Sequence, residues 1–162
     1  MNRKLSARGS EPSLPETTPR KPPELRQRKR TKPPLDMEAV LARQARRLAS
    51  AKRAILKEFG TLKTPGGDYE RLKQERRIFT VTQGDATYVP SFQFDENGRP
   101  RPAVARVIQI LGEDRGMSDW GLALWFTGAN GWLDDKRPVD VLKEEPEEVV
   151  QAAEQEAAEL VF

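Results

Sequence analysis

A long helix is expected over residues 37–59, MEAVLARQARRLASAKRAILKEF, because this stretch contains neither glycine nor proline. Asp36 before it suits an N-cap, and Gly60 after it suits a helix stop. At about 100° per residue, one narrow apolar stripe is formed by Met37, Leu41, Leu48, Ile55 and Phe59. The opposite side carries Arg43, Arg46, Arg47, Arg53 and Lys57. The stretch therefore predicts an amphipathic helix with a basic face.

The segment before this helix has a composition that opposes folding. Residues 1–36 hold seven of the 13 prolines and ten Lys/Arg against four Asp/Glu, with few apolar residues. Such a segment cannot bury enough apolar surface to offset its conformational entropy. We therefore predict a disordered basic tail over 1–36. The remaining residues, about 125, suffice for a modest hydrophobic core.

Residues 60–100 switch from turn signals to β-favouring ones. Pro65-Gly66-Gly67 predicts a turn, and 68–77 predicts a short basic helix with Tyr69 and Leu72 facing inward. RIFTVTQGDATYVP, residues 77–90, predicts a β-hairpin that turns at Gln83-Gly84-Asp85. We expect residues 37–100 to form a basic segment consisting of a long helix, a short helix and a wing-like hairpin.

Residues 101–162 predict a small helical bundle. Val104, Val107, Ile108 and Leu111 have the spacing of a packed helix face. Ser118 is suited to cap a helix that starts at Asp119, while Pro138 and Pro146 are suited to the first turns of two more helices. The inward face expected for the last helix is Val149, Val150, Ala153, Ala157 and Leu160. The predicted fold class is α+β, mostly α: disordered tail, long basic helix, one hairpin, then a C-terminal helical bundle.

The absence of histidine and cysteine argues against an enzyme. It removes the most frequent general base, the thiol nucleophile and most metal-site ligands. Asp134-Asp135 is more simply explained as a polar loop than as a catalytic pair, and the glycines match neither dinucleotide nor Walker spacing. We expect no catalytic residues, metal or cofactor. With no signal-like start and no apolar run of membrane-spanning length, we expect a cytoplasmic protein with no membrane partner.

Charge divides the chain into two unlike halves. Residues 1–77 hold 21 Lys/Arg against nine Asp/Glu, whereas 78–162 hold seven against 16. A short helix followed by a hairpin is also the order found in winged-helix and excisionase-like DNA readers. The candidate nucleic-acid residues are Arg43, Arg46, Arg47, Arg53, Lys57, Arg71, Lys73, Arg76 and Arg77. The alternatives are a merely solvated basic face or a protein partner.

Residues 120–142, WGLALWFTGANGWLDDKRPVDVL, hold all three tryptophans around a polar bend. Taken alone, they predict a small core in which Trp120, Trp125 and Phe126 fill space. The pattern also resembles the toxin-binding domain of the Xre/MbcA/ParS-type antitoxins, in which a helix ending in Trp leads through an Asn loop to an Arg-Pro segment. The matching positions are Trp125, Asn130, Leu133, Arg137, Pro138, Val139, Asp140 and Leu142. Asp134-Asp135 replaces the Gly-Gly found in that family.

The resemblance covers roughly residues 102–160 and implies a non-enzymatic function. A cognate toxin, often a RES-type enzyme that consumes NAD, would be neutralised by the C-terminal module, while the basic N-terminal half contacts DNA. The toxin-binding residues that the resemblance implies are Trp125, Asn130, Leu133, Arg137, Pro138 and Asp140. Two other interpretations stay open: a stand-alone DNA-binding regulator that uses the module to form a homodimer, and a purely structural interaction protein.

Overall fold

The long helix α1 spans Met37–Phe59, the range that the sequence predicts. The Asp36 carboxylate caps it by accepting hydrogen bonds from the backbone N–H groups of Glu38 and Ala39, at 3.1 and 3.4 Å. The computed structural model describes residues 36–62 and 68–159, together with Gly9. Residues 1–8 and 10–35 of the tail expected over 1–36, the turn expected at 65–67 and Leu160 lie outside the described residues.

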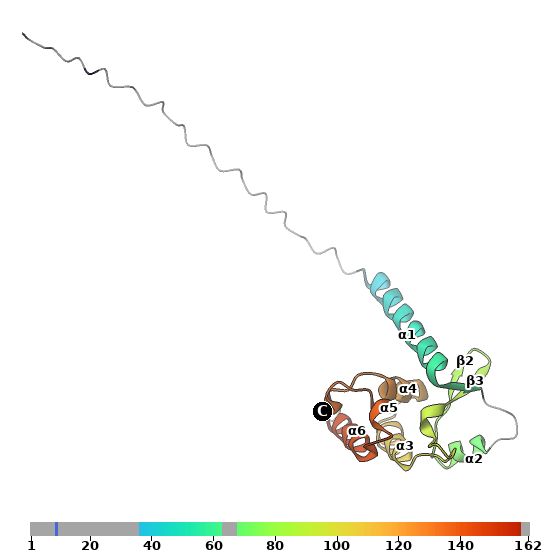
Figure 1. Ribbon diagram of the computed structural model, residues 1–162. Coiled ribbons are helices and arrows are strands. Elements are labelled where there is room, and N and C mark those ends of the chain that lie inside the picture. The colour runs from blue at the N-terminus through green and yellow to red at the C-terminus, as the bar shows by residue number, and fades with distance from the viewer. Residues whose placement is uncertain (1–8, 10–35, 63–67, 160–162) are drawn as a thin grey trace, which may run out of the picture. The chain divides into compact units, whose positions relative to one another are not determined.

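The apolar stripe of α1 is buried only near the C-terminal end of the helix. Ile55 is 5% exposed, whereas Met37, Leu41 and Leu48 are 63%, 57% and 43% exposed. Figure 1 shows the reason: the N-terminal half of α1 projects away from the strands and the other helices. Periodicity thus located the helix correctly but overestimated how much of its apolar face is covered.

Twelve elements follow one another along the described chain. In order they are α1 (Met37–Phe59), β1 (Gly60–Leu62), α2 (Tyr69–Gln74), β2 (Val81–Gln83), β3 (Ala86–Pro90), the 3-10 turn η1 (Ser91–Gln93), α3 (Pro102–Val107), the π-helical segment η2 (Ile108–Glu113), α4 (Asp119–Thr127), the 3-10 turn η3 (Gly131–Leu133), α5 (Pro138–Val141) and α6 (Pro146–Glu159). The α+β, mostly helical class predicted from the sequence is confirmed.

The strands form one antiparallel sheet in the order β1-β3-β2. The predicted hairpin is present: Val81 pairs with Tyr88, and the turn uses Gly84 at a φ of +59°, a conformation that glycine adopts without steric cost. The third strand was not predicted. It is β1, which directly follows α1 and pairs Gly60 with Pro90 on the other edge of β3. The hairpin is therefore fixed to the long helix through β1.

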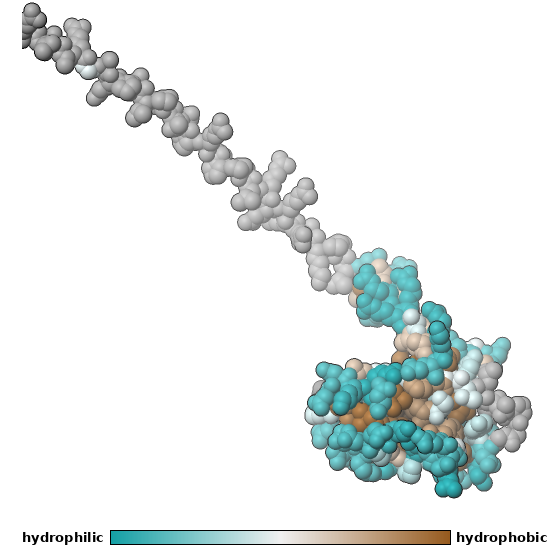
Figure 2. Space-filling model, in the orientation of Figure 1, coloured by the Kyte–Doolittle hydropathy of each residue, from teal (hydrophilic) through white to brown (hydrophobic). Residues whose placement is uncertain are grey.

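Among the described residues, the larger of two hydrophobic clusters includes residues from both sides of residue 100. Ile55, Phe79 and Phe92 pack in the same cluster as Val104, Phe126 and residues of α6. The expected face of α3 is buried, although the helix widens into π-helical η2 at Ile108. On the visible face, apolar side chains gather in the middle of the domain between hydrophilic borders (Figure 2). Residues 36–162 belong to a single compact unit. The bend after α4 is therefore part of the same unit as the sheet and the other helices.

Candidate functional site

The bend that follows α4 begins at an abrupt helix end. The Ser118 hydroxyl caps the start of α4 by accepting a hydrogen bond from the backbone N–H of Gly121 at 3.1 Å. At the other end, Gly128 donates its backbone N–H to the Leu124 carbonyl and then continues in extended conformation. The chain therefore leaves the helix within one residue and crosses the surface toward α6.

Asn130 is the residue that organises the bend. Its side-chain oxygen accepts a hydrogen bond from the backbone N–H of Trp132 at 2.9 Å. Its backbone N–H donates to the Lys136 carbonyl at 3.0 Å, while its own carbonyl accepts from Leu133 and Asp135, both at 3.0 Å. Asn130 is only 7% exposed. Four hydrogen bonds on one buried residue hold the loop in a single shape, as expected for a side chain that stabilises a turn.

The two aspartates of the bend serve its geometry. Asp134 and Asp135 both adopt left-handed backbone conformations, with φ of 54° and 62°. Glycine takes this conformation most readily, and aspartate is one of the few other residues that tolerate it. Both side chains are exposed. This agrees with the prediction that Asp134-Asp135 is a polar loop.

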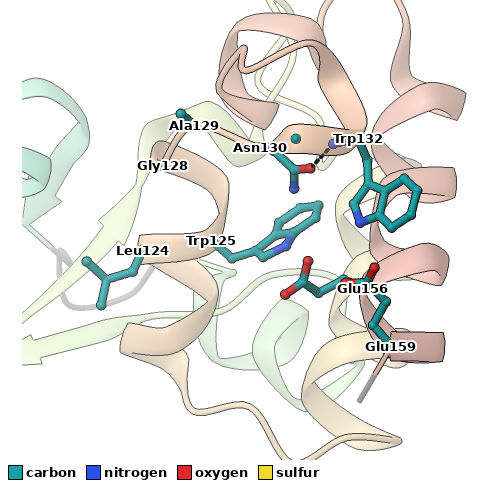
Figure 3. A pocket seen from close by; sticks show the side chains of 9 residues that line it. Leu124, Trp125, Gly128, Ala129, Asn130, Trp132, Glu156 and Glu159 are labelled. Carbon is teal, nitrogen blue, oxygen red and sulfur yellow. Dashed lines mark hydrogen bonds between the residues drawn. The ribbon is translucent and has the colours of Figure 1, made fainter. Parts of the chain in front are cut away.

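A pocket of about 490 Å³ opens beside the bend. Its nine lining residues come from α4, the bend and the last turns of α6: Leu124, Trp125, Gly128, Ala129, Asn130, Gly131, Trp132, Glu156 and Glu159. We call it the indole pocket, because two indole rings stand in its wall (Figure 3). Trp132 is 47% exposed, and Trp125 is half-buried. The Nε1–H of Trp125 is shielded from solvent and has no hydrogen-bond partner among the described residues.

Arg137 binds across the domain rather than into the indole pocket. Its guanidinium donates two hydrogen bonds to Glu58 of α1, both at 3.1 Å, and two to Asp140, at 2.7 and 3.0 Å. The same group lies 6.0 Å from the ring centroid of Phe59. The hydrogen bonds from Arg137 hold the pKa of the Asp140 carboxyl below its usual range. Arg137 thus links α5 to the end of α1.

The six residues implied as toxin-binding do not all occupy one surface. Trp125 and Asn130 line the indole pocket. Leu133 and Pro138 are buried beneath the bend, so they support the loop. Arg137 donates hydrogen bonds to Asp140 and to Glu58 of α1 instead. The residues that remain accessible beside the loop include three that the sequence did not single out as site residues, namely Trp132, Glu156 and Glu159.

Sequence signals for the missed residues differ in strength. Trp132 lies inside the tryptophan-rich stretch, and its position directly after an Asn-Gly turn is a signal for exposure. Glu156 and Glu159 lie among many carboxylates on α6, and nothing distinguishes them before α6 is placed against the bend. Trp120, by contrast, has a structural role, since its Nε1–H donates to the Thr82 carbonyl at 3.0 Å and so joins α4 to the hairpin.

The nine candidate nucleic-acid residues fall into two groups, which differ in whether their side chains form ion pairs with nearby carboxylates. On α1, the basic side chains Arg43, Arg46, Arg47, Arg53 and Lys57 are exposed and form no ion pair within the described part of the chain. On and after α2, Arg71 pairs with Asp68 at 3.5 Å, Arg77 pairs with Glu75 at 3.7 Å, and Arg76 pairs with Glu113. Lys73 is exposed. Most of the positive charge near α2 is therefore compensated locally.

The two groups also lie apart. In Figure 1, α2 is at the far end of the domain from the projecting half of α1, with the strands between them. The nine candidate residues therefore occupy two separate places on the domain, and their contact with nucleic acid stays a prediction.

Comparisons of the chain with protein-family models, with characterised proteins and with solved structures found no match. The likeness to toxin-binding antitoxin domains therefore stays a prediction that depends on residues 120–142. Across 36–62 and 68–159, no helix combines the length and the apolar character needed to cross a membrane.

Replacing Arg137 with alanine tests the link between α5 and α1. Because the ion pairs are partly exposed, we expect Arg137→Ala to lower the free energy of unfolding by only about 1 kcal/mol at neutral pH and low salt. The pKa of Asp140 is lowered in the folded state, so its share of this stabilisation is present above the usual aspartate value of 3.8 and is lost as the pH falls through the lowered value. Urea unfolding of both proteins at pH 7 and near pH 3 measures the difference, which should shrink in acid. An unchanged difference would exclude a contribution from this pair.

Proposed function

We propose that this chain is an antitoxin-like adaptor that neutralises a cognate toxin through its C-terminal helical module and contacts DNA through its basic N-terminal half. The bend after α4 and the indole pocket beside it form the docking surface for the toxin. The projecting half of α1 provides the nucleic-acid contact. On this proposal the protein acts by binding and covering, without chemistry of its own.

The observation that carries the proposal is the rigidity of the bend together with the exposure of its aromatic rim. Asn130 fixes the loop with four hydrogen bonds, yet Trp132 on the same loop remains 47% exposed. Exposed tryptophans on pre-organised loops are frequent anchors of protein interfaces, because little conformational entropy is lost when they bind. The acidic balance of residues 78–162 favours a basic surface on the partner.

Co-expression with the neighbouring open reading frame tests the toxin half of the proposal. We expect the neighbour alone to arrest growth, and co-expression of this chain to restore growth and to yield a complex that copurifies. A harmless neighbour, or growth arrest that persists in the presence of this chain, would contradict the antitoxin function. The result would then favour a stand-alone DNA-binding regulator if DNA retention is intact.

Charge reversal on α1 tests the nucleic-acid half. The triple variant Arg43→Glu, Arg46→Glu, Arg47→Glu removes three cations that form no ion pair with any residue the structure describes, so it should abolish DNA retention at moderate salt. For the wild-type protein, the logarithm of the binding constant should fall steeply with the logarithm of salt concentration, with a slope near −0.9 per phosphate neutralised.

A matched control separates position from net charge. The triple variant Arg71→Glu, Lys73→Glu, Arg77→Glu changes the net charge equally but acts near α2, where acidic neighbours already compensate two of the cations. Its DNA affinity should fall much less than that of the α1 variant. Equal losses for the two variants would assign binding to overall charge and remove α1 from the interface. Gel mobility at several salt concentrations gives the comparison.

A further inference from the structure

We infer that the indole pocket receives an arginine side chain from a partner protein. The inference relies on the proposed function only in assigning this arginine to a partner. The pocket's preference for a guanidinium group comes from its own lining. None of its nine lining residues is basic, two are tryptophans and two are glutamates.

The aromatic part of the lining comes from two different elements. Trp125 projects from α4 and Trp132 from η3, and Figure 3 shows both indole rings beside the same space. The Trp125 ring makes an edge-to-face contact with Phe126, at 5.2 Å between ring centroids, which helps to hold it in place. Trp132 is fixed through its backbone by Asn130. A cation that enters between two positioned indole rings gains from their electron-rich faces, and tryptophan is the strongest side chain for this interaction.

The acidic part comes from the last turns of α6. Glu156 is half-buried and Glu159 is exposed, and in Figure 3 both carboxylates reach toward the space beside the indole rings. They stand at the C-terminal end of a 14-residue helix, where the helix dipole adds negative potential. Neither glutamate has an ion pair within the described part of the chain. Two unpaired carboxylates at a negative helix end favour a cationic occupant.

Arginine fits this lining better than lysine does. Its planar guanidinium can stack on an indole face while its N–H groups donate in parallel to a carboxylate, whereas an ammonium group is a compact and strongly hydrated charge. The pocket opens to solvent, so a side chain carried on a larger partner can enter it. Its volume of about 490 Å³ leaves room for a guanidinium together with its aliphatic stem.

Titration with a small arginine probe tests the inference on the full chain without any partner. The probe is N-acetyl-arginine amide, and the matched comparison is the citrulline compound, which has nearly the same shape but no charge. Two-dimensional ¹H–¹⁵N NMR follows the three indole N–H signals, assigned with single Trp→Phe variants. We expect saturable shifts for Trp125 and Trp132 in the millimolar range, and no shift for Trp120, whose Nε1–H is bound to Thr82.

The titration with the three compounds either supports or overturns the inference. Shifts with the arginine compound and none with the citrulline compound support the inference. Equal shifts with both compounds, equal affinity for N-acetyl-lysine amide, or no shift at any accessible concentration would overturn it.

A charge-neutralised variant gives an independent test. The double variant Glu156→Gln, Glu159→Gln should bind the arginine probe at least about fivefold more weakly, because each carboxylate contributes a charge-assisted contact. The control Glu148→Gln, Glu154→Gln removes two exposed carboxylates from the same helix outside the pocket and should bind like wild type. Equal affinity of the pocket variant and the wild type would overturn the inference.

Failure here is distinguishable from failure of the proposed function. If the pocket variant still neutralises and copurifies with the neighbouring gene product as the wild type does, the arginine assignment is wrong while the adaptor function stands. If the probe binds as expected but no toxin is neutralised, the pocket chemistry stands and the antitoxin function is wrong.

Discussion

Phe126→Ala is expected to lower the free energy of unfolding by about 3–5 kcal/mol, the usual cost of truncating a fully buried phenylalanine. Phe126 is 0% exposed and lies at the centre of an aromatic cluster. Its ring stacks on Phe79 with centroids 6.1 Å apart and contacts Phe92 at 5.1 Å. Because these three rings come from both sides of residue 100, the variant should weaken the whole domain. Urea unfolding followed by circular dichroism measures the loss.

Trp132→Ala is the control for this loss. It removes a larger side chain, but one that is 47% exposed, so the free energy of unfolding should change by about 1 kcal/mol or less. Similar losses for the two variants would mean that Phe126 does not hold the core together. A loss confined to the C-terminal helices, with the sheet melting separately, would contradict a single shared core.

Gln93→Leu is expected to cost about 3 kcal/mol or more, although leucine has a similar volume. Gln93 is 0% exposed, and its side chain accepts a hydrogen bond from the Phe79 backbone N–H at 2.7 Å. It also donates to the carbonyls of Phe79 and Pro90, at 2.8 and 3.1 Å. Leucine would remove all three hydrogen bonds and leave the buried N–H and C=O groups of Phe79 unpaired, and each such group costs about 1–3 kcal/mol.

The matched control for Gln93 is Gln83→Leu, at the exposed end of β2. Its free energy of unfolding should stay within about 0.5 kcal/mol of wild type. Thermal and chemical unfolding of both variants gives the comparison. A Gln93→Leu protein as stable as the control would show that the backbone around Phe79 finds other partners.

Local signals in the sequence predicted much of the fold. Asp36 and Ser118 begin the helices that they were expected to cap, and Pro138 stands at the start of α5. These features depend on neighbouring residues alone, so a single sequence reveals them. Strand β1 was missed because three residues, Gly60–Leu62, are too few to show an alternating pattern. Strand β1 forms because the backbone N–H and C=O groups along one edge of β3 are available for pairing.

The sequence indicated which stretch of the chain forms the candidate site, but not which distant residues contact it. The stretch from Trp125 to Arg137 was found because its residue types are unusual together. Arg137 binds Glu58, which lies 79 residues earlier in the chain. The spacing of residues in the sequence could not predict this contact, because it exists only after α1 packs on α4. The same holds for Glu156 in the indole pocket. Contacts of this kind follow from tertiary packing, which local patterns do not encode.

The most direct test of the docking surface is the affinity of Trp132→Ala for the product of the neighbouring gene, measured by isothermal titration with the purified proteins. We expect binding to weaken by roughly 30-fold, as for an anchor residue at an interface, while the fold is retained. Leu41→Ala truncates an apolar side chain on α1 that is 57% exposed, against 47% for Trp132, and it should bind with wild-type affinity. Wild-type affinity of the Trp132→Ala protein would contradict the assignment of the bend after α4 as the docking surface.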